Sequence, residues 1–123
     1  TQAEVESLIL KTGAKVTLYR GNTLTSLPQA VPALPPMDFI FIDGGHSVET
    51  IASDWKYTQI LMHEKTVVIF DDYWRNREDA GCKTTVDAID RSKYTVEILV
   101  EVDSFDNPDF GHLDISFARV TKK

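Results

Sequence analysis

Two stretches of the chain place aspartates directly after apolar runs. FIFIDGGHS (residues 39–47) reaches Asp43, and TVVIFDDYW (residues 66–74) reaches Asp71 and Asp72. Three carboxylates brought close together repel one another, so they need protonation, a cationic side chain or a metal ion. An all-oxygen site of this kind suits Mg²⁺, Mn²⁺ or Ca²⁺. The spacing supports a metal site and purely structural aspartates, which cap a helix or begin a turn, about equally.

The residues that follow Asp43 add a second chemical group. His46 lies on the same rim, and a histidine near neutral pH can take a proton from a hydroxyl group. Gly44 and Gly45 have no side chains, so a ligand can approach the backbone closely there. The structural alternatives are an exposed histidine at a helix start and two glycines in a tight turn.

Two strands joined by a helix must position these residues. The continuous apolar runs at 37–42 and 66–70 predict strands buried on both faces. Ser47 is a predicted N-cap of a helix that runs to about Met62. A strand–helix–strand unit of this kind forms a right-handed crossover, so both strands end at the same edge, ~4.8 Å apart if they are neighbours. Ligands bind beyond that edge in open parallel sheets.

The segments before the first of these strands predict a helix, a strand and an irregular connection. Residues 3–11 have helical spacing and are followed by Gly13, which is typical of a helix end. Residues 15–22 predict a strand that ends at Gly21. Four prolines within 28–36 predict a stiff connection without regular structure.

The segments after the second strand predict a short helix and a hairpin. Residues 84–92 give the helix, with Val86 and Ile89 facing inward. Alternating residues at 94–102 and 112–120 predict an antiparallel hairpin joined by the acidic turn SFDNPDFG. The whole pattern predicts an α/β three-layer sandwich with a mainly parallel sheet.

Composition narrows the class of protein. The chain has 123 residues, 42% hydrophobic and 26% charged, which is typical of one soluble globular domain, complete or partial. Its net charge of −6 argues against nucleic-acid or anionic-membrane binding. Cys82 is the only cysteine, which excludes an internal disulfide and favours a reducing compartment. TQAEVESL is no signal peptide and no apolar run approaches the ~20 residues of a membrane span, so we expect a cytoplasmic protein.

The two aspartate motifs together resemble part of a known family. DFIFIDGGHSVETIASDW and VVIFDDYW resemble the carboxyl-terminal half of class I S-adenosylmethionine-dependent methyltransferases. Within these they most resemble the group related to macrolide and antibiotic-sugar O-methyltransferases, which pair an I-D-G-x-H segment with a downstream D-D-Y. The resemblance extends from residues 15–20 to residues 112–120 and implies a Rossmann-like fold.

The resemblance also implies roles for individual residues. Asp43, Asp71 and Asp72 match carboxylates that hold a divalent cation such as Mg²⁺, and His46, with Asp43, matches the catalytic position of a general base. The remaining matches are cofactor-binding or acceptor-pocket positions: Gly21, Asn22, Asp43, Gly44 and Gly45 for S-adenosylmethionine, and Tyr73 and Trp74 for the acceptor. The structural alternative for Tyr73 and Trp74 is packing of the turn between strand and helix.

One part of the family pattern is absent. The chain has neither the first strand with its glycine-rich turn nor a second strand that ends in an acid. The absent strand would lie beside residues 37–42, so its loss exposes a strand edge. Residues 15–20 pairing there, a second copy forming a homodimer, or a longer protein would each cover the edge. Poor cofactor affinity is expected in each case.

The sequence therefore predicts a methyltransferase that transfers a methyl group to an oxygen of a small hydroxylated molecule with metal assistance. The alternative is an inactive methyltransferase-derived remnant or binding module that acts through self-association. A phosphoryl-transfer receiver is less well supported, because its single aspartate comes first here and no lysine closes a later strand. The acidic stretch 103–109 lacks the spacing of a calcium loop and favours a solvated hairpin.

Overall fold

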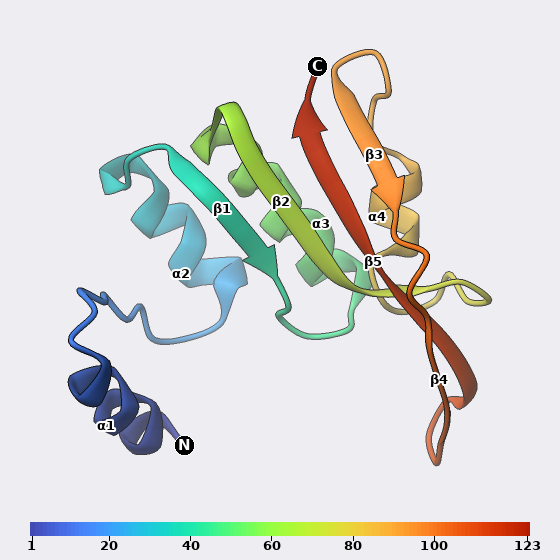
Figure 1. Cartoon of the computed structure of the whole chain (residues 1–123), viewed down its shortest axis with the longest axis horizontal. Coiled ribbons are helices and arrows are strands. Elements are labelled where there is room, and N and C mark those ends of the chain that lie inside the picture. Colours follow the sequence, from blue (N-terminus) through green and yellow to red (C-terminus); the bar gives the residue numbers. More distant parts are fainter.

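Five strands form one mixed sheet with helices packed on one of its faces (Figure 1). The computed structural model describes residues 1–123. The helices are α1 (Gln2–Thr12), α2 (Thr23–Ala30), α3 (Val48–Thr58) and α4 (Lys83–Asp87), with 3₁₀ turns η1 (Val31–Ala33) and η2 (Gln59–Leu61). The strands are β1 (Met37–Ile42), β2 (Met62–Trp74), β3 (Tyr94–Ile98), β4 (Asp103–Asn107) and β5 (Gly111–Lys122). None of the helices combines the length and apolarity needed to span a bilayer.

The strand order is β1-β2-β5-β3, and β4 pairs with one end of β5. β1 and β2 are parallel and joined through α3, as predicted, whereas β5 is antiparallel to β2, β3 and β4. The α/β, Rossmann-like class is therefore confirmed, but the expectation of a mainly parallel sheet is wrong. β5 lies between β2 and β3 and also pairs with β4, so every antiparallel pair of the sheet includes β5.

The hydrophobic core lies between the sheet and α3 and α4. Alternate strand residues point toward these helices: Ile40 and Ile42 of β1, Val68 and Phe70 of β2, Ala118 and Val120 of β5. Trp55 of α3 fills the centre, with its ring 5.6 Å from that of Phe70 and 5.2 Å from that of Tyr94. This packing fixes the sheet register, because a one-residue slip would turn all of these side chains to the other face.

The opposite face of the sheet carries no helix (Figure 1). Phe39 and Phe41 of β1 are 60% and 49% exposed there, and Phe117 of β5 lies 6.3 Å from Phe41. The predicted third layer and the prediction of strands buried on both faces are therefore wrong for this chain. An apolar run has the same composition whether one or both of its faces are covered, so the sequence did not distinguish the two cases.

Helix caps explain where the predicted helices begin. The Ser47 hydroxyl accepts a hydrogen bond from the Thr50 amide at 3.1 Å, which confirms the predicted N-cap of α3. That α-helix ends at Thr58, before the predicted Met62, because η2 tightens the last turn ahead of β2. At the other end of the chain, α1 ends at Gly13, which has φ 68°, as predicted.

Three predictions for the remaining segments are wrong. Residues 15–20 form no strand and are exposed, so the outer edge of β1 stays unpaired. Within the proline-rich stretch, Pro28 lies inside α2, which ends two residues later and continues as η1. Half of the expected acidic turn, residues 104–107, forms part of β4, and the strand predicted over 94–102 stops at Ile98.

The predicted short helix after β2 is present as α4 but ends at Asp87. Val86 and Ile89 are buried, as predicted. The antiparallel pairing of residues 94–98 with β5 is also confirmed.

Asp54 is an unusual residue of this core. It lies on the buried side of α3, is 5% exposed, and its Oδ1 atom has no hydrogen-bond partner. Burial raises the pKa of this carboxyl above its ordinary value, with a smaller opposing effect from the Thr23 hydroxyl. An ionised Asp54 carboxylate in this buried position therefore destabilises the fold.

Replacement of this group should change how stability depends on pH. The folded protein holds the Asp54 proton more tightly than the unfolded chain does. Protonated Asp54 therefore stabilises the fold below the ordinary pKa of ~3.9, and this contribution is lost as the pH rises through the raised pKa of the folded state. We expect Asp54→Asn to raise the free energy of unfolding at neutral pH by about 1 kcal/mol. Urea titrations across this pH range measure the effect, with Asp109→Asn in the exposed β4–β5 turn as control. Parallel pH profiles for Asp54→Asn and the unmodified chain would contradict it.

Candidate active site at the ends of β1 and β2

Three carboxylates meet where β1 and β2 end. Ile42 and Phe70 are paired in the parallel register, so the residues that follow them leave the sheet side by side. One ligand oxygen from each of Asp43, Asp71 and Asp72 lies within 4.8 Å of the others. The structure thus brings together the three aspartates that the spacing predicts to converge, and their binding of a metal stays a prediction.

A break in the strand geometry lets Asp71 and Asp72 share this place. Successive residues of a regular strand point to opposite faces. Here the β2–β5 register shifts between Phe70 and Tyr73, and Asp72 has φ 62°, the one positive value outside glycine. Asp71 Oδ1 also accepts a hydrogen bond from the Asp72 amide at 2.7 Å. A β-bulge of this type re-aims side chains, and backbone strain of this kind is commonly found at functional sites.

The loop after β2 forms backbone hydrogen bonds with the bulge at Asp72 and with the His46 segment. Gly81 donates its amide to the His46 carbonyl at 2.8 Å, and Cys82 donates to the Asp72 carbonyl at 2.9 Å. Gly81 has φ 78°, and a Cβ atom there would lie 2.4 Å from the Asp72 carbonyl oxygen. Gly81 therefore links the two aspartate motifs. No sequence pattern indicated this role, because an isolated glycine in a polar stretch is typical of any turn.

His46 lies beside the carboxylates and remains half-exposed. Its Nε2 atom is 3.2 Å from Asp72 Oδ2, and its ring lies 5.5 Å from that of Trp74. Trp74 in turn directs Nε1 toward Asp72 Oδ1 at 3.3 Å. Asp72 thus lies between the indole donor of the buried Trp74 and the imidazole of the half-exposed His46.

The three carboxylates of the cluster repel one another. Burial raises the pKa of Asp71 above its ordinary value, and the neighbouring Asp43 carboxylate raises it further, against the hydrogen bond from the Asp72 amide. Arg75 and Arg77 do not relieve this repulsion, because they bind Ser116 and Asp79. Three clustered carboxylates whose basic neighbour is the half-exposed His46, rather than a lysine or arginine, form a donor set that fits a hard divalent cation such as Mg²⁺.

Tyr73 and Trp74, the residues predicted for an acceptor pocket, are both buried. The Tyr73 hydroxyl donates to Asp87 Oδ1 at 2.8 Å, and its ring belongs to the main core. The Trp74 ring packs 5.0 Å from that of Phe110. The structure places both as packing residues beneath the carboxylates, and a role toward an acceptor stays a prediction.

The residues predicted for the cofactor lie on the β1 side of the site. Asp43 and Gly44 line a cavity of about 210 Å³ together with Thr23 at the start of α2. Gly45 is adjacent, while the Asn22 side chain caps α2 by accepting from the Leu24 amide at 2.9 Å. Ligand pockets are commonly ~300–1,000 Å³, so these residues fit one part of a nucleotide-sized cofactor.

A larger cavity, of about 450 Å³, opens on the other side of Asp71 and Asp72. Its far wall is formed by segments that the sequence pattern does not link to the site: the 99–102 connection, β4 and β5. Glu101, Asp103, Phe105 and Phe117 are among the residues of this wall. The sequence signal was weak, since an acidic stretch beside alternating residues is typical of any solvated hairpin.

Comparison with known proteins gives a family match. A family model described as a methyltransferase domain matches residues 2–73, which is more than half of the chain. The matched span contains all three aspartates and His46. No curated protein and no solved structure matches the chain.

The close approach of Gly81 to Asp72 gives a testable prediction. Gly81→Ala should lower the free energy of unfolding by more than about 2 kcal/mol, because the new Cβ meets a backbone oxygen in addition to the positive φ. Gly111→Ala is the matched control, since Gly111 has φ 77° and open space around its Cβ position. Chemical denaturation measures both variants, and equal losses would show that the contact with Asp72 contributes nothing.

Proposed function

The chain belongs to a family of methyltransferase domains, and from this premise we propose that it transfers a methyl group from S-adenosylmethionine to a hydroxyl of a small molecule with the help of a divalent cation. The observation that carries the proposal is the meeting of His46 with Asp43, Asp71 and Asp72 at one edge of the sheet. A base beside an all-oxygen cation site can deprotonate a hydroxyl group that the cation binds.

Each part of the site has a proposed ligand. Asp43, Asp71 and Asp72 would hold the cation. Asp43, Gly44 and Gly45, with Gly21 and Asn22 at the start of α2, would contact part of the cofactor. When bound, S-adenosylmethionine supplies an electrophilic methyl group on a sulfonium, and the cation supplies positive charge that lowers the pKa of the acceptor hydroxyl.

His46 is the proposed base. It is half-exposed at the rim, so an acceptor can reach its ring, and the Asp72 carboxylate 3.2 Å away stabilises the imidazolium that forms when the hydroxyl proton is taken. Gly81 holds the His46 carbonyl and thereby limits movement of this segment relative to Asp72. Orientation of the hydroxyl by these fixed groups lowers the barrier further.

The acceptor is proposed to occupy the cavity beside Asp71 and Asp72. A small molecule with vicinal oxygens suits this position, because two adjacent oxygens can chelate a cation held by the same aspartates. Tyr73 and Trp74 support the floor of this region from the core side.

An inactive remnant that acts through self-association is the second candidate. The unpaired edge of β1 favours it, since pairing of two β1 edges in a homodimer would cover both edges. The exposed Phe39 and Phe41, on the open face of the sheet, are further apolar surface for contact between copies. This candidate does not account for the cation donor set beside His46, and we therefore place it second.

The proposed cation site predicts stabilisation by Mg²⁺. At a concentration about ten times its Kd, Mg²⁺ should add about 1.4 kcal/mol to the free energy of unfolding. Asp43→Asn and Asp72→Asn should each abolish this gain, because each removes an anionic ligand. Asp109→Asn, a change of the same kind in an exposed turn, should keep it. Thermal melts with and without Mg²⁺ measure the response, and a chain whose melting ignores Mg²⁺ has no such site.

The proposed reaction predicts a specific loss on removal of the base. With S-adenosylmethionine, Mg²⁺ and 4-methylcatechol as a test acceptor, His46→Gln should lower the turnover number by about 100-fold or more. Calorimetry should show that the variant still binds S-adenosylmethionine, since His46 is not a proposed cofactor contact. Transfer of a labelled methyl group measures turnover. Silence of the unmodified chain at millimolar cofactor would support the remnant instead.

A further inference from the structure

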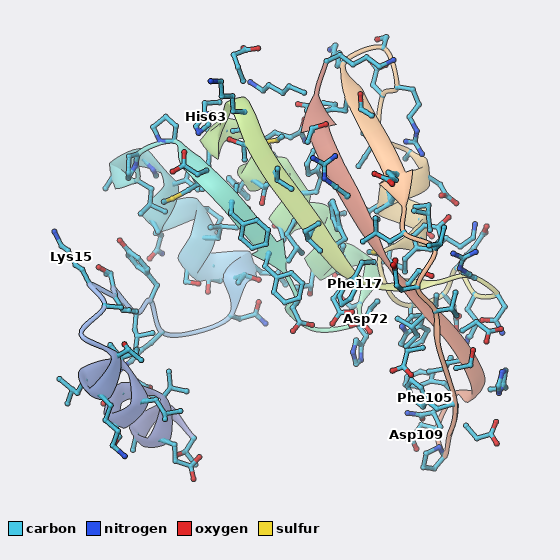
Figure 2. All side chains as sticks on the ribbon, in the orientation of Figure 1. Lys15, His63, Asp72, Phe105, Asp109 and Phe117 are labelled. Carbon is cyan, nitrogen blue, oxygen red and sulfur yellow. The ribbon has the colours of Figure 1, made fainter.

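The cavity beside Asp71 and Asp72 has two chemically distinct walls. Phe105 and Phe117 are each 40% exposed and form an apolar wall, and Glu101 and Asp103 form an acidic one. In Figure 2, Asp72 and Phe117 lie together at the carboxyl end of β2, and Phe105 lies further along the β4–β5 hairpin. The walls belong to the cavity in which the proposed acceptor would sit.

The apolar wall suits a flat ring. Partly exposed phenylalanines lose unfavourable contact with water when a ring stacks on them, and aromatic pairs gain further from offset or edge-to-face contact. Asp103 and Phe105 are two residues apart on β4, so their side chains leave the same face of the strand. A ring against Phe105 therefore has a carboxylate within reach of its substituent.

The acidic wall is electrostatically unbalanced. Glu101 and Asp103 are exposed and make neither an ion pair nor a side-chain hydrogen bond, and no lysine or arginine lines the cavity. Arg75 binds the Ser116 hydroxyl and the Leu99 carbonyl instead. A divalent cation held by the aspartate cluster would offset most of the negative charge of the cluster and leave the acidic wall negative, so the wall attracts cations and repels anions.

The acidic wall is also held in place. Before Glu101, the Leu99 amide donates to the Phe117 carbonyl at 2.9 Å, and Arg75 Nη2 donates to the Leu99 carbonyl at 3.0 Å. After Glu101, Asp103 enters β4 paired with Ile115 of β5. A backbone that is positioned before a ligand arrives loses less entropy on binding, so the segment that carries these two carboxylates is suited to selection.

We propose that the acceptor is a hydroxylated ring compound that carries a protonated amine, with Glu101 and Asp103 as the residues that select the amine. This inference rests on the proposed function for the identity of the cavity as the acceptor site. The ring would lie against Phe105 and Phe117, its vicinal oxygens would face Asp71 and Asp72, and its ammonium group would face the acidic wall.

Three catechols that differ in charge test the proposal. Dopamine, 4-methylcatechol and 3,4-dihydroxybenzoate share a ring with vicinal oxygens and carry an ammonium, no charge and a carboxylate. Calorimetry of the full chain in Mg²⁺ should give the tightest binding for dopamine and the weakest for the benzoate, with about threefold between successive compounds. The preference should shrink as salt is added, because exposed charges are screened.

Single substitutions assign the preference to the acidic wall. Glu101→Gln and Asp103→Asn should each weaken dopamine binding by about threefold and leave 4-methylcatechol binding unchanged. Glu64→Gln is the matched control, because Glu64 is exposed near the opposite end of β2. Circular dichroism should confirm that each variant is folded.

The outcomes separate this inference from the proposed function. Equal binding of the three catechols, or an unchanged preference in both acidic-wall variants, would overturn amine selection even if methyl transfer occurs. Selection of dopamine without methyl transfer would support the cation-binding cavity and overturn the proposed reaction. Failure of all three compounds to bind at millimolar concentration would overturn the acceptor site and the selection together.

Discussion

Mutual repulsion of three carboxylates is the constraint around which this end of the structure is organised. Parallel pairing of β1 and β2 brings Asp43 and Asp71 to one edge, and the kink at Asp72 adds a third negative charge. Burial of Asp71 makes its ionisation still less favourable and raises its pKa. The fold holds these groups together by packing of α3 against the sheet, so folding energy gained in the core maintains an arrangement that is unfavourable on its own.

The carboxylates are held in place on their core side and open to solvent on their outer side. On the core side, Trp74 and the Gly81 turn hold Asp72 through an indole donor and a tight backbone contact. On the outer side, His46 and the larger cavity remain open to solvent. A site with a fixed floor and an open rim can bind a small molecule without a large rearrangement of the chain.

Local sequence was sufficient wherever adjacent residues decide the structure. The Ser47 cap, the end of α1 at Gly13 and the strand β1 follow from side-chain hydrogen bonding, backbone preference and apolar runs. The convergence of the aspartates followed from one added rule, that parallel strands joined by a helix end at the same edge. Residues 15–20 show the limit of such reasoning, because a β-prone segment forms a strand only when the fold places it against a strand edge, and these residues are not paired with the free edge of β1.

The sequence alone determined which residues can do chemistry: two aspartate motifs, a nearby histidine and the strand–helix–strand unit between them. Only the tertiary structure decided which face of the sheet is covered, how Asp72 turns toward its neighbours, and that Gly81, Glu101 and Asp103 belong to the same region. The physical reason is distance along the chain. Hydrogen bonds and apolar spacing act over a few residues and are visible in the sequence, whereas the bulge, the loop contact and the cavity walls arise from segments that meet only after the sheet has formed.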